Sequence, residues 1–275
     1  MQQAFPEGGS PSAAGLTLVG VGPGDPQLLT IAAVRAIEAA AVVAYPVARE
    51  GADGMAATIA APWIGASQRR LPLLFPMVVE AAPRIAAWHA AAAALAAEVA
   101  AGAQVVLLCE GDASLFASCS YVLLALAVRY PSCPVRVIPG ITSVAAAAAV
   151  ASARGPSGAL VMPWPLALQD EGLLIRTTPE SVAGFERLLD WAAGTGAGGA
   201  AETGAQTTLA LLKLGHRWSW VRPLLESRGL LDQALFAQRV GWPEQLLAPA
   251  AQVPASEQPY FSLLLVRQGW PQVLP

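Results

Sequence analysis

The sequence contains little lysine, histidine or cysteine, and these shortages exclude several kinds of site. Lys213 is the only lysine among 275 residues, and His89 and His216 are the only histidines. The three cysteines are odd in number and show no CxxC spacing, so the sequence indicates neither a disulfide framework nor a zinc site. With so few histidines we also predict no histidine-based metal site, and therefore no bound metal ion.

Charge and long apolar runs are also scarce. Charged residues make up 13% of the chain, and the formal net charge is −3. The basic residues are scattered, whereas a nucleic-acid surface needs a basic stripe, so we expect no nucleic-acid partner. Charges and helix breakers interrupt every long apolar stretch before it reaches about 18–20 residues, so we expect no membrane span. The first residues, MQQAFPEGGSPSAAG, lack the features of a secretory signal. We expect a disordered leader over 1–14 and a cytoplasmic protein.

What the sequence does contain is an alternation of strand and helix patterns. Hydrophobic residues make up 55% of the chain, enough for a large core. This alternation predicts an α/β fold with a largely parallel sheet. The patterns predict strands over 16–21, 41–45, 104–112, 134–140, 159–165, 207–215, 232–240 and 259–266. They predict helices over 26–40, 81–102, 114–130, 142–153, 179–194 and 217–229.

The same reading predicts two α/β domains, 15–139 and 140–275, divided near Pro139 and Gly140. The segment 194–206, rich in glycine, alanine and threonine, is typical of a flexible surface loop.

The stretch LVGVGPGDPQLLT follows the first predicted strand and raises the question of a phosphate-binding loop. Gly20 and Gly22 begin the dinucleotide pattern GxGxxG, but its third glycine position is occupied by Asp25. Pro23 has no backbone N–H to donate to a phosphate, and Asp25 would repel one. No Gly-Lys-Ser/Thr follows. The loop is therefore not predicted to hold a phosphate, which argues against a nucleotide-dependent oxidoreductase.

Two further turns follow predicted strands in the same way. CEGDASLF covers 109–116, and VIPGITS covers 137–143. Asp112 and Thr142 could each be a simple helix N-cap. Three such turns at the ends of successive parallel strands nevertheless favour a ligand-binding edge of the sheet.

With these residues in view, the chain resembles the tetrapyrrole methylases. VGVGPGDPQLLT, VVAYP, EGD, PGITS, LLKLG and YFSLLLV occur in the order typical of that family, over 16–267. The family's members are S-adenosylmethionine-dependent enzymes of corrin and sirohaem biosynthesis. The resemblance implies two α/β domains with the active site in the cleft between them, a homodimer, and a cofactor bound mostly by loops. S-adenosylmethionine has no phosphate, which agrees with the absence of a phosphate cradle.

The resemblance also implies roles for individual residues. Cofactor-binding positions carried over from the family are Pro23, Gly111, Asp112, Leu115, Thr142, Ser143, Leu214 and Val240. Substrate-binding positions are Asp25, Tyr45, Arg49 and Lys213, with Arg69, Arg217 and His216 as further cleft candidates. Arginines can bind the carboxylates of a tetrapyrrole in a bidentate manner, although such a residue is more often a solvated surface charge than a ligand. The sequence does not identify a catalytic residue.

AYP, LPLLFPM, LCEGD, LKLG and YFSLLLV are most similar to the members that methylate C-20 of precorrin-2 in cobalamin biosynthesis. The same reaction on cobalt-precorrin-2, or a sister corrin methylase, is the nearest alternative. An alternative from another class is a non-catalytic tetrapyrrole-binding protein. Its support is the turn GDASLF, where the family usually has a proline and then an aromatic–glycine pair. The segment after Arg154 is also shorter than in the family, and 194–206 resembles an insertion.

Overall fold

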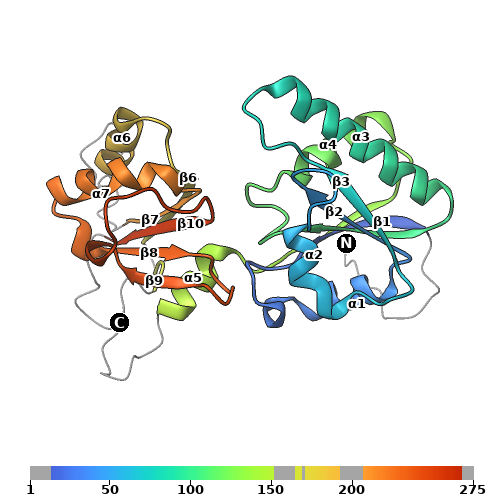
Figure 1. The fold of residues 1–275 in the computed structure, drawn as a ribbon, viewed down its shortest axis with the longest axis horizontal. Helices are drawn as coiled ribbons and strands as arrows, with labels where there is room; N and C mark the ends of the chain where they lie inside the picture. Colours follow the sequence, from blue (N-terminus) through green and yellow to red (C-terminus); the bar gives the residue numbers. More distant parts are fainter. Residues whose placement is uncertain (1–13, 152–164, 169–170, 193–206, 268–275) are drawn as a thin grey trace. The chain divides into compact units, whose positions relative to one another are not determined.

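The structure is a computed structural model that describes residues 14–151, 165–168, 171–192 and 207–267. The chain divides into two compact units, Met1–Thr142 and Ser143–Pro275 (Figure 1). Both units combine a five-stranded sheet with helices, which gives the α/β fold that the sequence predicts. The sequence pattern had placed the division slightly earlier, at 139/140.

The sheet of the first unit has the strand order β3-β2-β4-β1-β5, and all its neighbouring strands are parallel. The carboxyl ends of the five strands therefore lie at one edge. These strands are β1 (Gly15–Gly20), β2 (Val42–Val47), β3 (Arg69–Leu74), β4 (Gln104–Cys109) and β5 (Val135–Ile138).

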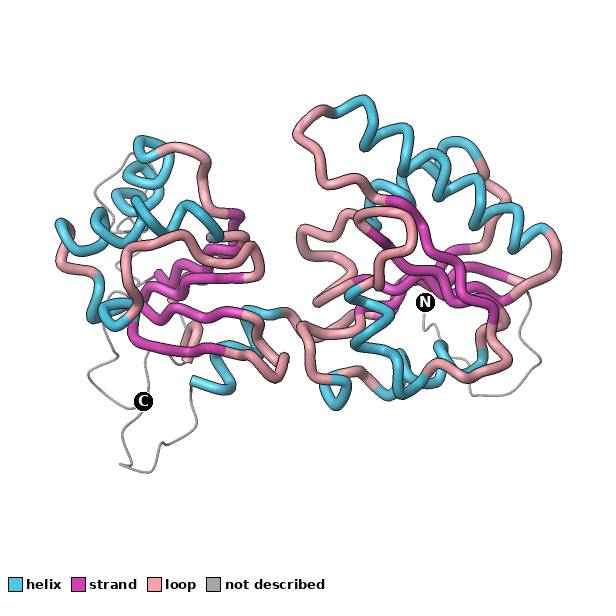
Figure 2. The backbone as a smooth tube through the Cα atoms, in the orientation of Figure 1, coloured by secondary structure: helices cyan, strands magenta, loops and turns pink. Residues whose placement is uncertain are grey.

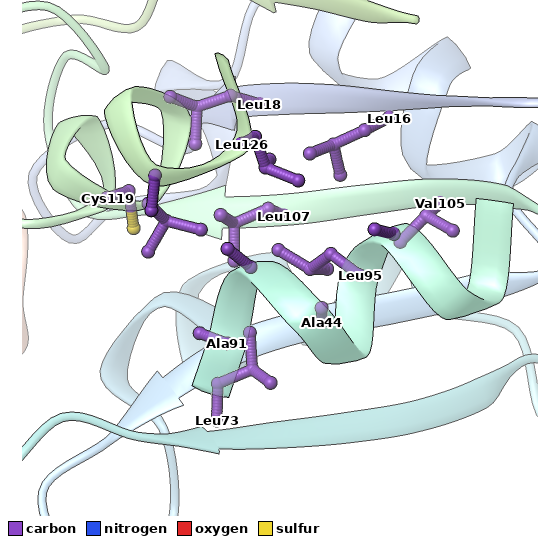
Figure 3. Close-up of a cluster of buried hydrophobic side chains, with 14 of the residues drawn as sticks. Leu16, Leu18, Ala44, Leu73, Ala91, Leu95, Val105, Leu107, Cys119 and Leu126 are labelled. Carbon is purple, nitrogen blue, oxygen red and sulfur yellow. The ribbon is translucent and has the colours of Figure 1, made fainter. Parts of the chain in front are cut away.

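Helices cover both faces of this sheet. They are α1 (Ile31–Ala39), α2 (Met55–Ala60), α3 (Ala81–Ala100) and α4 (Cys119–Arg129). Figure 1 shows α3 and α4 on one face and α1 and α2 on the other. The core beneath α3 and α4 is drawn in Figure 3, where Leu95 of α3 packs with Leu107 of β4 and Leu16 of β1.

The second unit has a mixed sheet of order β6-β7-β10-β8-β9. Strands β6 and β7 are parallel, whereas β10 is antiparallel to both of its neighbours, β7 and β8. Because β10 reverses the direction between them, the carboxyl ends of β7 and β8 lie at the same edge. The strands are β6 (Gly172–Thr177), β7 (Thr207–Leu212), β8 (Ala234–Gln238), β9 (Leu246–Pro249) and β10 (Ser262–Arg267).

Two helices pack on one face of the second sheet. Helix α6 (Val182–Ala192) contributes Phe185, and α7 (Trp218–Ser227) contributes Trp218, to a core with Phe236 of β8. Helix α5 (Ser143–Ala151) begins the unit and contacts β9. Figure 2 shows how helices and strands alternate along most of the tube.

The predicted helix over 26–40 is interrupted. Asp25 caps only a short 3-10 helix, Pro26–Leu28, by accepting a hydrogen bond from the Gln27 N–H at 2.8 Å. Leu29 then adopts an extended conformation, and α1 starts after Thr30, whose side chain accepts from the Ala33 N–H. A second capping residue inside the run thus ends one helix and starts another.

Other departures from the sequence patterns have similar local causes. Strand β3 was not predicted, because Pro72 interrupts its pattern, but an edge strand tolerates proline. Helix α4 begins at Cys119 rather than near Ser114, because 113–118 form a turn in which Phe116 has φ 53°.

Several predictions concern residues outside the described ranges. These are the leader 1–14 and the strand 159–165, of which only the last residue is described in each case. The shortened segment after Arg154 and the loop 194–206 also lie outside these ranges. Among the helices that the structure describes, none has the length and apolarity needed to cross a bilayer.

Candidate functional site

Three glycine turns meet at the carboxyl edge of the first sheet. They follow β1, β4 and β5, which are neighbours in the sheet. A Cβ atom at Gly140 would lie 2.2 Å from the carbonyl oxygen of Gly111, and one at Gly20 would lie 2.6 Å from the Gly140 nitrogen. Any side chain at Gly20 or Gly140 would therefore displace backbone. Glycine is required here because three backbones approach each other closely.

The turns after β1 and β4 are also joined by hydrogen bonds. Gly22 and Gly111 form an isolated antiparallel bridge, in which the Gly111 N–H donates to the Gly22 carbonyl at 2.8 Å and the Gly22 N–H donates to the Gly111 carbonyl at 3.1 Å. Gly22 and Gly111 have φ values of 78° and 66°, a region open mainly to glycine. A Cβ at Gly111 would meet no atom within 4 Å, so its backbone borders open space.

Asp112 connects the turn after β5 to the turn after β4 through hydrogen bonds. One carboxylate oxygen accepts from the Ser114 N–H at 2.9 Å and from the Ser114 hydroxyl, and the other accepts from the Gly140 N–H at 2.8 Å. Burial alone would raise the pKa of Asp112, but these hydrogen bonds outweigh it and the pKa lies below its usual value. Asp112 is thus a buried structural anion as well as a predicted cofactor residue.

Sequence reasoning missed Glu110, the residue between Cys109 and Gly111. Glu110 is an exposed residue, although the protein around its carboxylate desolvates it enough to raise its pKa from 4.5 to about 7. The available signal was its place in the EGD motif, directly before the predicted cofactor residue Gly111 and directly after a buried strand. An acidic residue at the end of a strand is common, so the sequence alone could not separate Glu110 from a surface carboxylate.

The topology makes this edge a natural ligand site. The connection from β1 passes through α1 on one face of the sheet, and the connection from β4 passes through α4 on the other face (Figure 1). In open parallel sheets, ligands bind outside the carboxyl ends of adjacent strands whose connections diverge in this way. Gly22 and Gly111 lie at that point.

The other predicted residues of the first unit lie on loops or strand ends of the same edge. Pro23, Asp25, Leu115 and Thr142 are half-buried in the turns, and Leu115 donates its N–H to the Asp112 carbonyl. Tyr45 lies near the end of β2, with its ring against Gly54, where a Cβ would lie 2.4 Å from the ring.

Arg49 follows β2 and is exposed. Arg69 does not join this edge, because it is the first residue of β3 and pairs with Glu98 of α3.

The second unit places its predicted residues at the carboxyl ends of β7 and β8. Lys213 has φ 58°, and its ammonium group lies 6.0 Å from the ring centroid of Tyr260. Arg239, at the equivalent position after β8, has φ 47°. Such left-handed conformations of non-glycine residues occur preferentially at functional sites. Tyr260 and Phe261, just before β10, are each 42% exposed beside these two cations.

Leu214 and Val240 have buried side chains. The Leu214 N–H donates to the Ser262 carbonyl, and the Leu214 carbonyl accepts from the Arg217 N–H. These residues therefore shape the turns from the core side. Ser143 is the first residue of α5, His216 is exposed in the turn after β7, and Arg217 is engaged in an ion pair with Glu180.

Two kinds of comparison identify similar sequences. The family model of the tetrapyrrole (corrin/porphyrin) methylases matches residues 15–252. A cobalt-precorrin-2 C(20)-methyltransferase of Salmonella typhimurium is 30% identical over 93% of this chain and 97% of its own length. A precorrin-2 C(20)-methyltransferase of Sinorhizobium sp is 32% identical over 92% of this chain and 94% of its own length.

Solved structures share the fold. The cobalt precorrin-4 methyltransferase CbiF matches with a TM-score of 0.62 at 18% identity, covering 92% of this chain and 94% of its own. The uroporphyrin-III C-methyl transferase from Thermus thermophilus, complexed with S-adenyl homocysteine, matches with a TM-score of 0.56 at 22% identity, covering 92% and 91%. At these identities the likeness shows the arrangement of the chain and no more.

Proposed function

This chain belongs to the tetrapyrrole (corrin/porphyrin) methylases, and from that premise we propose that it methylates C-20 of precorrin-2 in cobalamin biosynthesis. The observation that carries the proposal is the similarity to two C(20)-methyltransferases, which extends over more than nine-tenths of each chain. The methylases of this family take the methyl group from S-adenosylmethionine.

The residues of the first unit fit such a cofactor. The backbone of Gly111 borders open space at the switch point of the sheet, where a ligand can approach without meeting a side chain. Pro23 removes a donor from the adjacent turn, and Asp25 adds a negative charge, which suits a cationic sulfonium better than a phosphate. We propose that Pro23, Gly111, Leu115, Thr142 and Ser143 contact it, while Asp112 holds the turns in shape.

The reaction needs positioning more than it needs reactive side chains. The bound cofactor supplies an already activated methyl group, and the tetrapyrrole meso carbon is electron-rich through conjugation with its pyrrole nitrogens. The protein's main contribution is then to hold carbon, methyl and sulfur in line. The close backbone contacts among Gly20, Gly111 and Gly140 give the rigidity that such alignment demands.

The substrate is a polycarboxylate, so cations at strand ends are its natural partners. We propose that Lys213 and Arg49 bind its carboxylates and that Tyr45 and Asp25 line its site. Lys213 is well suited, because the left-handed turn after β7 fixes its backbone and because its ammonium group forms no ion pair with the residues that the structure describes. We propose that Leu214 and Val240, whose side chains are buried beneath the turns of the second unit, contribute to the cofactor site.

Turnover of the purified protein on two substrates tests the proposal. We expect S-adenosylmethionine-dependent methylation of precorrin-2 or of cobalt-precorrin-2, and the ratio of kcat/KM for the two identifies the physiological form. Product analysis that places the methyl group at another carbon would assign a sister methylase. Binding of the tetrapyrrole with no methyl transfer would instead support the non-catalytic binding protein, whose motivation is the altered turn containing Phe116.

We further propose that the protein acts in the cytoplasm as a homodimer. Cys109, Cys119 and Cys133 are free thiols, as expected in a reducing compartment. Light scattering should give twice the 28.2 kDa chain mass, and a monomer at micromolar concentration would contradict the dimer.

A further inference from the structure

We propose that Glu110 is the proton acceptor of the methyl transfer, a role that rests on the function proposed above. Neither the sequence motifs nor the comparisons assign any role to this residue. Three independent features support it: the place of Glu110 in the sheet, the absence of a partner for its carboxylate, and the environment of that carboxylate.

Glu110 lies where the sheet presents its ligand edge. It directly follows β4, which lies between β1 and β2, and it precedes Gly111 of the bridged turns. Leu107 and Cys109 of β4 face the core beneath α3 and α4. Strand alternation therefore directs Glu110 toward the opposite face.

Tyr45 shares that face with Glu110. Val42 and Ala44 of β2 belong to the core beneath α3 and α4, so the next residue along β2 points the other way. The register of β2 and β4 pairs Ala44 with Leu107, so its continuation places Tyr45, a proposed substrate residue, beside Leu108, two residues before Glu110 and on the same face.

The two acidic residues of the turn have different tasks. The Asp112 carboxylate accepts three hydrogen bonds, which connect the turns after β4 and β5. The Glu110 carboxylate forms no hydrogen bond or ion pair with the residues that the structure describes, and solvent reaches its side chain. Asp112 is thus positioned to hold the site, and Glu110 is free to exchange a proton within it.

The environment of Glu110 suits a base at neutral pH. Desolvation raises its pKa to about 7, where a general base is most effective because it is both available and able to hold a proton. No single charged neighbour accounts for the shift. Cys109 and Asp112 lie within two residues of Glu110 along the chain, and the Cys119 thiol of α4 interacts electrostatically with Glu110.

The step balances without an oxidant or reductant. A new C–C bond joins the methyl group to C-20, while the methyl–sulfur bond breaks and its electron pair stays on sulfur. C-20 then loses its proton to the Glu110 carboxylate, and the electrons of that C–H bond restore the conjugation of the macrocycle. The resulting carboxylic acid returns the proton to water before the next turnover.

The first test compares Glu110→Gln with the wild-type enzyme across pH 5–9. Wild-type kcat should rise with pH and level off above about pH 7, as Glu110 loses its proton. Removing a general base lowers the rate about 10²–10⁴-fold, so Glu110→Gln should show such a loss, and the rise near pH 7 should vanish. Glu110→Asp should recover part of the rate. Glu38→Gln, an exposed residue at the far end of α1, is the matched control and should behave as wild type.

Binding of S-adenosylhomocysteine, measured by calorimetry, separates the chemistry from the fold. Glu110→Gln should bind it as tightly as wild type does. A variant that keeps wild-type kcat and its rise near pH 7, or one that loses cofactor binding in proportion to activity, overturns the inference. A wild-type enzyme that methylates neither tetrapyrrole contradicts the proposed function itself, and this role with it.

A second readout needs no substrate. A carboxylate whose pKa is raised on folding makes the folded state less stable as pH rises from its unfolded value, near 4.5, to its folded value, near 7. The glutamine side chain of the variant does not titrate, so it makes no such pH-dependent contribution to the unfolding free energy. The unfolding free energy of Glu110→Gln minus that of wild type should therefore increase between pH 4.5 and pH 7 and stay constant above. A difference that is flat over this window contradicts the required environment.

Discussion

At the scale of the residue, the same amino acid has different tasks at different places in this protein. Gly111 lies beside open space and needs glycine for its positive φ, whereas Gly140 has no room for a Cβ at all. Glu110 and Asp112 are two positions apart, yet desolvation raises the pKa of the first and hydrogen bonds lower that of the second. Environment, not residue type, sets each role.

Gly140→Ala should destabilise the first unit strongly. The added Cβ would lie 2.2 Å from the Gly111 carbonyl oxygen and 2.8 Å from the Gly20 carbonyl carbon, so the backbone must shift. We expect a loss of unfolding free energy on the order of 1–3 kcal/mol, as for other overpacked sites. Gly65→Ala, whose Cβ would meet nothing closer than 3.6 Å, is the control. Equal urea midpoints for the two variants would contradict the close packing of the turns.

Two substitutions at Lys213 separate the strain of its left-handed backbone from the binding of the tetrapyrrole by its ammonium group. Lys213→Gly and Lys213→Ala remove the same ammonium group, but only alanine keeps a Cβ in the left-handed backbone conformation. The glycine variant should be more stable by about 1 kcal/mol in thermal or urea unfolding. Both should weaken tetrapyrrole binding by a similar factor, about 10–100-fold, because a charged hydrogen bond is lost. If binding is unchanged in both, Lys213 is not a substrate residue.

At the scale of the element, the site depends on how strand ends are joined. The turns after β1, β4 and β5 carry the glycines, and the bridge between Gly22 and Gly111 and the Asp112 carboxylate connect them. In the second sheet, β10 lies between β7 and β8, and the residues before it place Tyr260 beside Lys213 and Phe261 beside Arg239. Each sheet therefore presents its functional residues at one edge.

Asp112→Ala should loosen the turns after β4 and β5 together. A lowered pKa means that the carboxylate stabilises the fold above its unfolded pKa, near 3.8, and that this contribution disappears as pH falls through the lower folded value. We expect a loss of about 1.5–3 kcal/mol at pH 7, as for hydrogen bonds to a charged group. The difference from wild type should shrink below about pH 4. An equal difference at pH 7 and pH 3 in urea unfolding would show that the charge is not responsible.

At the scale of the whole molecule, binding of S-adenosylhomocysteine tests whether the altered turn containing Phe116 still forms a cofactor site. The turn containing Phe116 departs from the family pattern, yet the bridge at Gly111 and the hydrogen bonds of Asp112 are present in it. The backbone features that fit the cofactor thus do not depend on the missing proline. Binding of S-adenosylhomocysteine should therefore be intact.

Calorimetric titration with S-adenosylhomocysteine should give micromolar affinity. At 100 times the dissociation constant, a ligand that binds only the folded state adds about 2.7 kcal/mol to the unfolding free energy, so the melting temperature should also rise. Gly111→Ala, which brings a Cβ into the open space beside the turn, should weaken binding. Absence of binding to the wild-type protein would mean that the altered turn has destroyed the cofactor site.

The sequence by itself determined much of this protein. Strand and helix alternation gave the α/β fold, because a parallel sheet needs helical crossovers on its faces. The turn motifs identified the family, and their glycines marked the places where backbones meet. Sequence patterns failed where the position of an element in the fold determines its structure. Strand β3 was not predicted because it contains Pro72, which only an edge strand tolerates. The predicted helix over 26–40 is divided at Thr30.

Only the tertiary structure decided which residues are available for chemistry. Leu214 fits the family pattern, and the structure adds that its side chain lies in the core and that its backbone groups are hydrogen-bonded. Arg69 looked like a substrate ligand, but β3 places it at the opposite edge of the sheet, paired with Glu98. Glu110 is the first residue of the EGD motif, but the motif assigned it no role. Its raised pKa results from desolvation in the folded protein, so it could not be inferred from the residue type.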